Sequence, residues 1–310
     1  RKQRITHPKT VLLGPPKSGK SYLIYDYLAN FETQDYLYID FKDYRNNLEE
    51  IDIFLEDFIK ENKIKVLILG STGLIGHQVY NYLKDNSDFS LSNFSYRRKL
   101  NSETILLDAR NEQSFFDHIR SIQPNYIVNC IGVLISEAKQ DPKSAIFLNA
   151  HLPHRLEEFA NKINAKLIHM STDCVFSGNK QSPYLETDEK DGTDVYAKTK
   201  SLGEVDSKNH LTIRTSVIGP EIINGSGELF HWFMNQSGVI EGFTKAVWSG
   251  VTTIELAKAI KWFIENNTTG LYQLTNGISI KKYDLLHLFK KYTNKNIEIA
   301  KVDGIFTNKS

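Results

Sequence analysis

The sequence predicts an α/β protein: a doubly wound parallel sheet with a smaller, mostly helical lobe, preceded by a partial P-loop α/β segment. Two observations carry this prediction. Short apolar runs alternate with segments of helical spacing, which is typical of a parallel sheet covered by helices. Two different glycine-rich loops, at residues 14–21 and 70–76, each follow such a run. Loops of both kinds can bind phosphate.

The composition is that of an ordinary globular protein. The 310 residues are 40% hydrophobic and 24% charged, with a formal net charge of +1. Because nucleic acids and membrane surfaces attract a sustained basic field, this balance argues against both as partners. Cys130 and Cys174 are the two cysteines and no C-x-x-C spacing occurs, so we expect neither a disulfide framework nor a metal site. No apolar run approaches about 20 residues, and we expect a cytoplasmic protein.

The first elements resemble the start of an AAA-type ATP-binding protein. A strand is expected at 10–14, a helix at 20–31, a strand at 35–41 and an amphipathic helix at 47–63. The loop "GPPKSGKS" fits G-x-x-x-x-G-K-[ST], in which backbone N–H groups hold phosphate. Its candidate ATP-phosphate residues are Gly14, Gly19, Lys20 and Ser21.

The next strand does not continue that pattern. ATP hydrolysis needs a second apolar strand ending in Asp to hold Mg²⁺, and the strand at 66–69 ends in Gly70. We therefore expect residues 1–62 to be a P-loop ATPase-like fragment. A P-loop ATP-binding protein is the alternative.

A second series of strands and helices starts at this same strand. It predicts a dinucleotide-binding domain over 63–218 and a substrate-binding lobe over 219–310. The expected strands are 66–70, 89–96, 103–108, 125–132, 165–172 and 210–218, and the expected helices are 73–85, 112–121, 145–163 and 195–206.

The loop "GSTGLIG" lies between the first strand and helix of this series. Its glycines allow a tight turn and close approach to a pyrophosphate. Arg97 and Arg98 follow the second strand, where arginine meets the 2′-phosphate of NADP, although two arginines on a solvated turn are an equal alternative. Asp108 ends the third strand, from which a carboxylate can contact adenine. The candidate cofactor residues of the loop are Gly70, Thr72, Gly73, Leu74, Ile75 and Gly76.

Tyr196 and Lys200 are four residues apart, on one face of a predicted helix. A lysine one turn away favours the tyrosinate, so the spacing predicts a lowered pKa for Tyr196 and transfer of a proton near neutral pH.

From about residue 63 to the end, the chain resembles an extended short-chain dehydrogenase/reductase, most similar to the dTDP-4-dehydrorhamnose reductase branch. The resemblance rests on "GSTGLIG", "NCIG", "LNAHLP", "STDCVFSG", "YAKTK" and "IRTSVIGP". It implies a Rossmann fold and the reduction of the 4-keto group of a nucleotide-linked deoxysugar by NADPH, with NADH and a homodimer also possible.

The same resemblance implies roles for single residues. Tyr196 is expected to give the proton, Lys200 to hold the nicotinamide ribose and Thr172 to hydrogen-bond the carbonyl. Further cofactor contacts are expected from Asn129, Cys130, Ile131, Gly132 and Asn149, and substrate contacts from Asp173, Cys174, Val175, Phe176, Arg214 and Trp248.

Some of these expectations have alternatives. Arg214 could form a structural ion pair, and Trp248 could belong to the core. The branch commonly has Tyr where this chain has Cys174, and the chain stops at "DGIFTNKS", where we expect a further helical segment and hence a C-terminally incomplete lobe. A non-catalytic NADP-binding regulatory subunit on the same fold, such as that of methionine adenosyltransferase, is therefore the alternative function.

Overall fold

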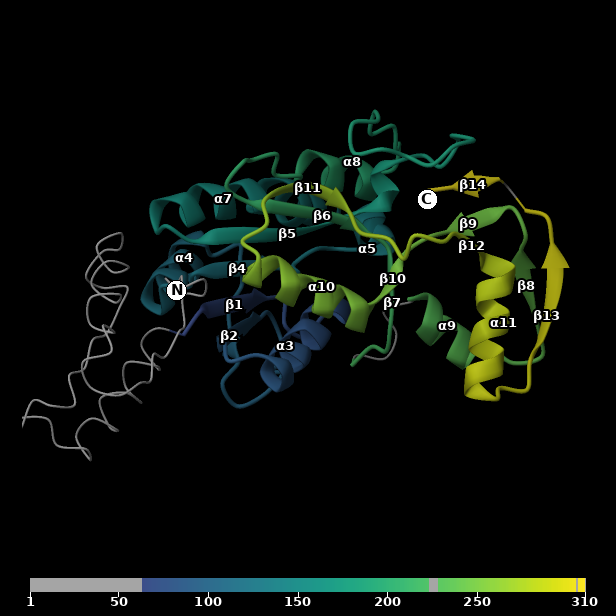
Figure 1. The fold of residues 1–310 in the computed structure, drawn as a ribbon, viewed down its shortest axis with the longest axis horizontal. Helices are drawn as coiled ribbons and strands as arrows, with labels where there is room; N and C mark the ends of the chain where they lie inside the picture. Colours follow the sequence, from purple (N-terminus) through teal and green to yellow (C-terminus); the bar gives the residue numbers. More distant parts are fainter. Residues whose placement is uncertain (1–62, 223–227, 305, 310) are drawn as a thin grey trace, which may run out of the picture. The chain divides into compact units, whose positions relative to one another are not determined.

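The computed structural model describes residues 63–222, 228–304 and 306–309 (Figure 1). The ATP-phosphate candidates Gly14, Gly19, Lys20 and Ser21 lie outside the described residues, so that prediction stays a prediction. Residues 63–310 form one compact unit. No helix among the described residues is long and apolar enough to cross a membrane.

A seven-stranded sheet is the centre of this unit. All of its neighbouring strands are parallel. Its order of strands confirms the doubly wound α/β fold. Across the sheet the strands are β3 (Ile105–Leu106), β2 (Ser90–Ser95), β1 (Lys65–Leu69), β4 (Tyr126–Asn129), β5 (Lys166–Thr172), β6 (Leu211–Thr215) and β11 (Gly270–Gln273).

Helices cover both faces of the sheet, as Figure 1 shows. Alternate residues of β1 point to opposite faces of the sheet and so belong to different helical layers. Val66 and Ile68 pack with α3 (Leu74–Asn86) and α10 (Thr253–Glu265). Leu67 and Leu69 pack with α4 (Glu112–Ile122) and α7 (Leu152–Lys162). The strand is apolar on both faces because both faces are buried. The remaining helical segments of this part are α5 (Ile135–Gln140), α6 (Pro142–Ala145), the π-helix η2 (Ile146–His151), the 3-10 helix η3 (Asp173–Val175) and α8 (Val195–Leu202).

A smaller lobe follows β6. It contains helices α9 (Leu229–Asn235) and α11 (Lys282–Thr293) together with strands, and it has its own core around Phe233, Trp248 and Phe289. Its strands are β8 (Val239–Phe243), β9 (Ala246–Trp248), β12 (Ile280–Lys281), β13 (Glu298–Val302) and β14 (Thr307–Asn308). A separate short pair, β7 (Val217–Ile218) with β10 (Val251–Thr252), lies between the lobe and the main sheet.

Part of the range expected to form the lobe returns to the main sheet. Helix α10 packs on α3, and β11 pairs with β6 in parallel, Leu271 opposite Thr212. The apolar side of α10 (Leu256, Ile260 and Ile264) is buried there. Residues 253–273 therefore pack with the dinucleotide-binding part, and in the sequence they lie between two segments of the lobe.

Candidate active site

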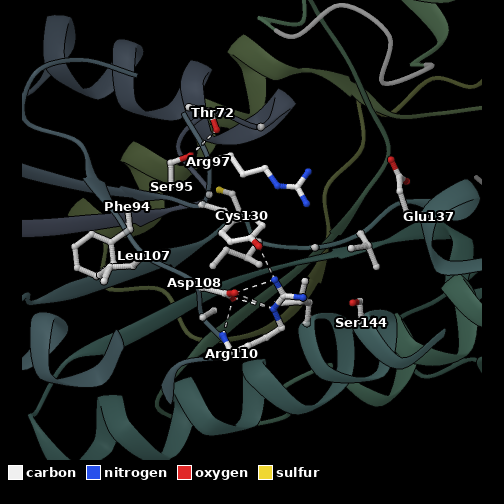
Figure 2. A pocket seen from close by; sticks show the side chains of 18 of the residues that line it. Thr72, Phe94, Ser95, Arg97, Leu107, Asp108, Arg110, Cys130, Glu137 and Ser144 are labelled. Atoms are coloured by element: carbon white, nitrogen blue, oxygen red, sulfur yellow. Dashed lines mark hydrogen bonds and ion pairs between the residues drawn. The ribbon is translucent and has the colours of Figure 1, made fainter. Parts of the chain in front are cut away.

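The site lies where the carboxyl ends of β1, β4 and β5 meet. In the register of the sheet, Leu69 is opposite Asn129 and Asn129 is opposite His169, so the loops after these strands leave from one edge. A cavity of about 470 Å³ lies at this edge, lined by residues of the loops after β1, β2, β3 and β4 (Figure 2). Ligands of open parallel sheets bind at this position.

The glycine turn after β1 requires glycine at two positions. Gly70 has a φ of +76°, in the left-handed region. A Cβ at Gly76 would lie 2.2 Å from the carbonyl oxygen of Gly70, so only glycine lets α3 approach the turn this closely. No side chain caps the start of α3, so no side-chain acceptor occupies its first N–H groups. This cradle fits a dinucleotide pyrophosphate.

Two arginines enclose an aromatic ring at the outer end of the cavity. The guanidinium carbons of Arg97 and Arg110 lie 4.8 and 5.2 Å from the ring centre of Tyr96. Arg110 also donates two hydrogen bonds to Asp108, of 2.9 Å from Nε to Oδ1 and 2.8 Å from Nη2 to Oδ2, and one of 2.7 Å to the Tyr96 hydroxyl (Figure 2). The hydrogen bond from Arg110 holds the pKa of Asp108 below its usual value. Arg97 forms no ion pair among the described residues and is the cation open to an anionic ligand.

Thr172 and Tyr196 come together at the carboxyl end of β5, the strand beside β4. Thr172 ends β5, and its Oγ1 accepts a 3.1 Å hydrogen bond from the Cys174 N–H. Tyr196 lies in the first turn of α8, which Asp194 caps by accepting a hydrogen bond from the Ala197 N–H. The Thr172 side chain acts on the Tyr196 phenol and lowers its pKa against the effect of burial, while the Thr172 hydroxyl donates a 3.2 Å hydrogen bond to Asp173 Oδ1. The two hydroxyl groups can therefore bind one carbonyl oxygen together.

Burial sets the protonation states of Tyr196 and Lys200. Burial raises the pKa of the Tyr196 phenol, and the nearby Cys174 and Asp173 raise it further. Burial lowers the pKa of Lys200 to about 8, opposed by Glu204 and Cys130. Lys200 is 5% exposed and donates a 2.6 Å hydrogen bond from Nζ to the Met170 carbonyl. At neutral pH the phenol is therefore protonated and the lysine remains mostly an ammonium ion.

The loop after β4 forms one wall of the cavity, and two buried asparagines hold it in place. Asn149 of η2 donates 3.0 Å to the Val133 carbonyl and accepts 2.9 Å from the Val133 N–H. Asn129 accepts 3.1 Å from the Ile131 N–H through Oδ1. A Cβ at Gly132 would lie 3.1 Å from Asn149 Oδ1, so the loop packs tightly on this amide. Both asparagines shape the wall from below the surface.

With this geometry established, comparisons with known proteins identify the family. The family model described as RmlD substrate binding domain matches residues 64–303. This chain belongs to that family. Its α/β fold and the resemblance inferred from the sequence are thereby confirmed.

Two curated relatives are similar over about half of the chain. The dTDP-4-dehydrorhamnose reductase of Escherichia coli (strain K12) is 31% identical over 158 residues, which is 49% of this chain and 51% of that protein. The methionine adenosyltransferase 2 subunit beta of Danio rerio is 32% identical over 148 residues, 47% of this chain and 44% of that protein. The chain thus spans about half the length of the curated relatives it matches.

Solved structures agree with the fold. The dTDP-4-dehydrorhamnose reductase of Bacillus anthracis str. Ames, determined in complex with NADP, superimposes with a TM-score of 0.67 at 22% identity, covering 78% of this chain and 84% of that chain. At this identity the likeness concerns the fold alone.

The structure brings many of the sequence-predicted cofactor residues to one cavity. Its lining includes Gly70, Thr72, Gly73, Arg97, Asp108, Cys130, Ile131 and Gly132. Leu74, Ile75 and Gly76 begin α3 beside the lining, and Arg98 is exposed outside it. Asn129, Asn149 and Lys200 are buried behind the wall. Among the described residues, no group of three or more His, Cys, Asp or Glu could hold a metal ion.

The predicted substrate residues divide into two groups. Asp173 and Cys174 are half-buried next to Thr172; burial raises the pKa of both, that of Cys174 to about 11, so the thiol is neutral. Val175 and Phe176 are fully buried, and Phe176 stacks on Tyr184 with ring centres 4.2 Å apart. These two side chains support the loop from inside the fold.

Arg214 and Trp248 are also held inside the protein. Arg214 is 3% exposed and donates to both carboxylate oxygens of Glu204, at 2.7 and 2.8 Å. Trp248 belongs to the core of the lobe and donates 2.9 Å to Ser216 Oγ. The geometry thus favours the alternatives that the sequence left open, a structural ion pair and a core tryptophan.

Sequence reasoning missed many of the residues that line the cavity, among them Tyr96, Arg110 and Val133. Tyr96 and Arg110 form the outer end, and Val133 forms part of the wall. A signal for two of them existed: Tyr96 precedes Arg97, and Arg110 lies two residues after Asp108, so each follows a strand end. Their meeting across two loops could not be inferred from spacing.

Proposed function

We propose that this protein reduces the 4-keto group of a nucleotide-linked deoxysugar with NADPH, a dTDP-4-dehydrorhamnose reductase-like activity that serves the synthesis of surface polysaccharide sugars. The observation that carries the proposal is that Thr172 and Tyr196 come together at the carboxyl end of β5, on the same edge of the sheet as the cavity that starts at the glycine turn. The similarity to the reductase of Escherichia coli supports it.

The residues of the cavity suit NADPH from one end to the other. The glycine turn and the N-terminus of α3 receive the pyrophosphate, and Arg97 receives the 2′-phosphate. NADH, which lacks that phosphate, is expected to bind more weakly. When bound, the cofactor supplies hydride. Lys200 lies behind the wall as a cation near the expected ribose, held by the Met170 carbonyl.

Tyr196 is the proton donor in this proposal. A reduction needs an acid at the carbonyl oxygen, and burial keeps the Tyr196 phenol protonated. Thr172 donates the second hydrogen bond and so polarises the carbonyl before hydride arrives. The proton then moves from the Tyr196 oxygen to the substrate oxygen as the alcohol forms.

A non-catalytic NADP-binding subunit is the second candidate. Two observations favour it: the similarity to methionine adenosyltransferase 2 subunit beta is as high as that to the reductases, and Cys174 replaces the tyrosine that we expect in the reductase branch. This candidate predicts NADPH binding without turnover.

The experiment that separates them follows NADPH oxidation on addition of dTDP- and UDP-linked 4-keto sugars. We expect turnover of at least one sugar and its loss in Tyr196→Phe, with NADPH binding unchanged in that variant. Binding of NADPH without oxidation on any sugar favours the subunit. Light scattering of the same preparation tests the proposed homodimer.

A further inference from the structure

Arg110 engages both oxygens of the Asp108 carboxylate. Its Nε donates to Oδ1 at 2.9 Å and to Oδ2 at 3.1 Å, and its Nη2 donates to Oδ2 at 2.8 Å. Its backbone N–H donates to Oδ1 as well, at 3.0 Å. Both residues line the cavity, where Figure 2 shows them side by side. The carboxylate is therefore held by the protein itself at the place where the sequence predicts a contact with adenine.

A further hydrogen bond ties Arg110 to the loop that carries Arg97. Arg110 Nη2 donates 2.7 Å to the hydroxyl of Tyr96, which precedes Arg97 directly after β2. The guanidinium carbons of Arg97 and Arg110 lie 4.8 and 5.2 Å from the centre of the Tyr96 ring. Both guanidinium groups thus contact one ring in the lining of the cavity, and Asp108 fixes one of the two.

The charge of Asp108 also reaches Arg97. Arg110 makes the largest contribution that lowers the pKa of Asp108, and attraction to Arg97 lowers it further. Over the part of the chain that the structure describes, Asp108 forms its ion pair with Arg110 and not with Arg97. The two other carboxylates of the lining are Glu137 of α5 and Asp141, which accepts two hydrogen bonds from Ser144. Arg110 is thus the group that keeps Asp108 from pairing with Arg97.

We propose that Arg110 is a specificity-determining residue for NADPH, because by occupying Asp108 it leaves Arg97 to the 2′-phosphate. This inference rests on the proposed use of NADPH and names the residue that sets the preference over NADH. Without Arg110, the Asp108 carboxylate repels the 2′-phosphate and attracts Arg97 away from it. A carboxylate at this end of a cofactor site can instead accept a hydrogen bond from the ribose hydroxyl of NADH. Loss of Arg110 therefore weakens the binding of NADPH and spares that of NADH.

The test titrates NADPH and NADH into each protein without a sugar, at low ionic strength because salt screens exposed charges. Arg110→Met is expected to lower the preference for NADPH, the ratio of the two Kd values, about fivefold or more. Arg120→Met is the matched control. Arg120 is also exposed, binds Asp117 at 2.8 Å and lies 5.3 Å from the ring centre of Phe159, but it does not line the cavity. Its loss is expected to leave the ratio within about twofold.

Two variants of Asp108 test the mechanism. In Arg110→Met/Asp108→Asn no carboxylate competes for Arg97, so the ratio is expected to return to within about twofold of that of the unaltered protein. Asp108→Asn alone is expected to keep the preference for NADPH. If Asp108 contacts adenine instead, Asp108→Asn weakens NADPH and NADH alike, since both carry adenine, and that result overturns the inference.

The other outcomes separate the inference from the proposed function. A ratio that Arg110→Met leaves unchanged overturns the inference, as does a loss that the double variant does not restore. Equal weakening of both cofactors in Arg110→Met shows a merely structural role and overturns it too. If Arg110 governs the ratio but no sugar is turned over, the proposed reduction fails and the inference stands. If sugar is turned over equally well with both cofactors, the reduction stands and the inference fails.

Discussion

Removing the guanidinium of Arg214 is expected to cost about 3–5 kcal/mol of the free energy of unfolding. The side chains of Arg214 and Glu204 are 3% and 2% exposed. The Glu204 carboxylate accepts hydrogen bonds from Arg214 Nε at 2.7 Å, Arg214 Nη2 at 2.8 Å, Ser171 Oγ at 2.7 Å and Lys190 Nζ at 3.1 Å. Arg214→Met removes two of the four and leaves a buried carboxylate with half of its partners. Hydrogen bonds to charged groups contribute about 1.5–3 kcal/mol each, so the loss of two gives about 3–6 kcal/mol, which overlaps that range.

Urea unfolding of three variants measures this effect. The double variant Arg214→Met/Glu204→Leu replaces both charges by apolar groups and is expected to recover most of the loss. Lys190→Met is the control: Lys190 lies at the half-exposed edge of the cluster, and its loss is expected to cost less than about 1 kcal/mol. A cost below about 1 kcal/mol for Arg214→Met refutes the reasoning about the buried pair.

The same variants separate the two roles considered for Arg214. If Arg214 is structural, the double variant keeps its KM for the sugar nucleotide. A tenfold rise of KM in a stable double variant shows that Arg214 contacts the substrate and refutes the structural assignment.

The pH dependence of the free energy of unfolding gives a further check on the buried pair. Burial raises the pKa of Glu204, but the hydrogen bonds from Arg214 and Ser171 lower it by more, so the pKa lies below its ordinary value of 4.5. The stability from this group is therefore present above about pH 4.5 and lost as the pH falls below that value.

Three further predictions concern the cofactor turn and the proton donor. Gly76→Ala places a Cβ 2.2 Å from the Gly70 carbonyl, so it is expected to weaken NADPH binding and lower the melting temperature, as thermal unfolding with and without NADPH measures. Tyr196→Phe is expected to lower kcat by about 10²–10⁴-fold with KM and the unfolding midpoint nearly unchanged; a variant that retains most of its kcat rules out Tyr196 as the donor. Lys200→Met is expected to leave the urea midpoint no lower, because burial of the ammonium disfavours its charged form. The same variant is expected to bind NADPH more weakly, as measured by fluorescence. A destabilised variant with normal NADPH binding contradicts both expectations.

The sheet strands were predictable where a buried strand ends in a turn signal. The run Val66–Leu69 is apolar on both faces and ends at Gly70, and the register with Asn129 follows from the parallel sheet. Strand β11 has no comparable signal, because Gly270–Gln273 is an edge strand that is only partly buried. Its place depends on pairing with Leu211–Thr215, nearly sixty residues earlier, and no local pattern encodes such a pairing.

The candidate site was predictable to the extent that single loops form it. The glycine turn and the loop after β4 each occupy one stretch of sequence, and both line the cavity. The contacts of Arg97 and Arg110 with the Tyr96 ring join two loops that are separate in the sequence. The motifs also do not show which of their side chains are buried. Phe176 lies in the same motif as Thr172, yet its ring packs against Tyr184 and Arg214 inside the protein.

Burial also changes the reasoning about the proton donor. The spacing of Tyr196 and Lys200 predicted a lysine that lowers the pKa of the phenol, which suits the removal of a proton from an alcohol. In the structure the Lys200 ammonium binds the Met170 carbonyl, and burial raises the pKa of Tyr196. A phenol that holds its proton is in the form that the proposed reduction needs at its start, because the oxygen of the substrate must gain a proton as hydride arrives. The structure thus presents Tyr196 in the protonated form that the proposed reduction requires, with Lys200 held behind the wall by the Met170 carbonyl.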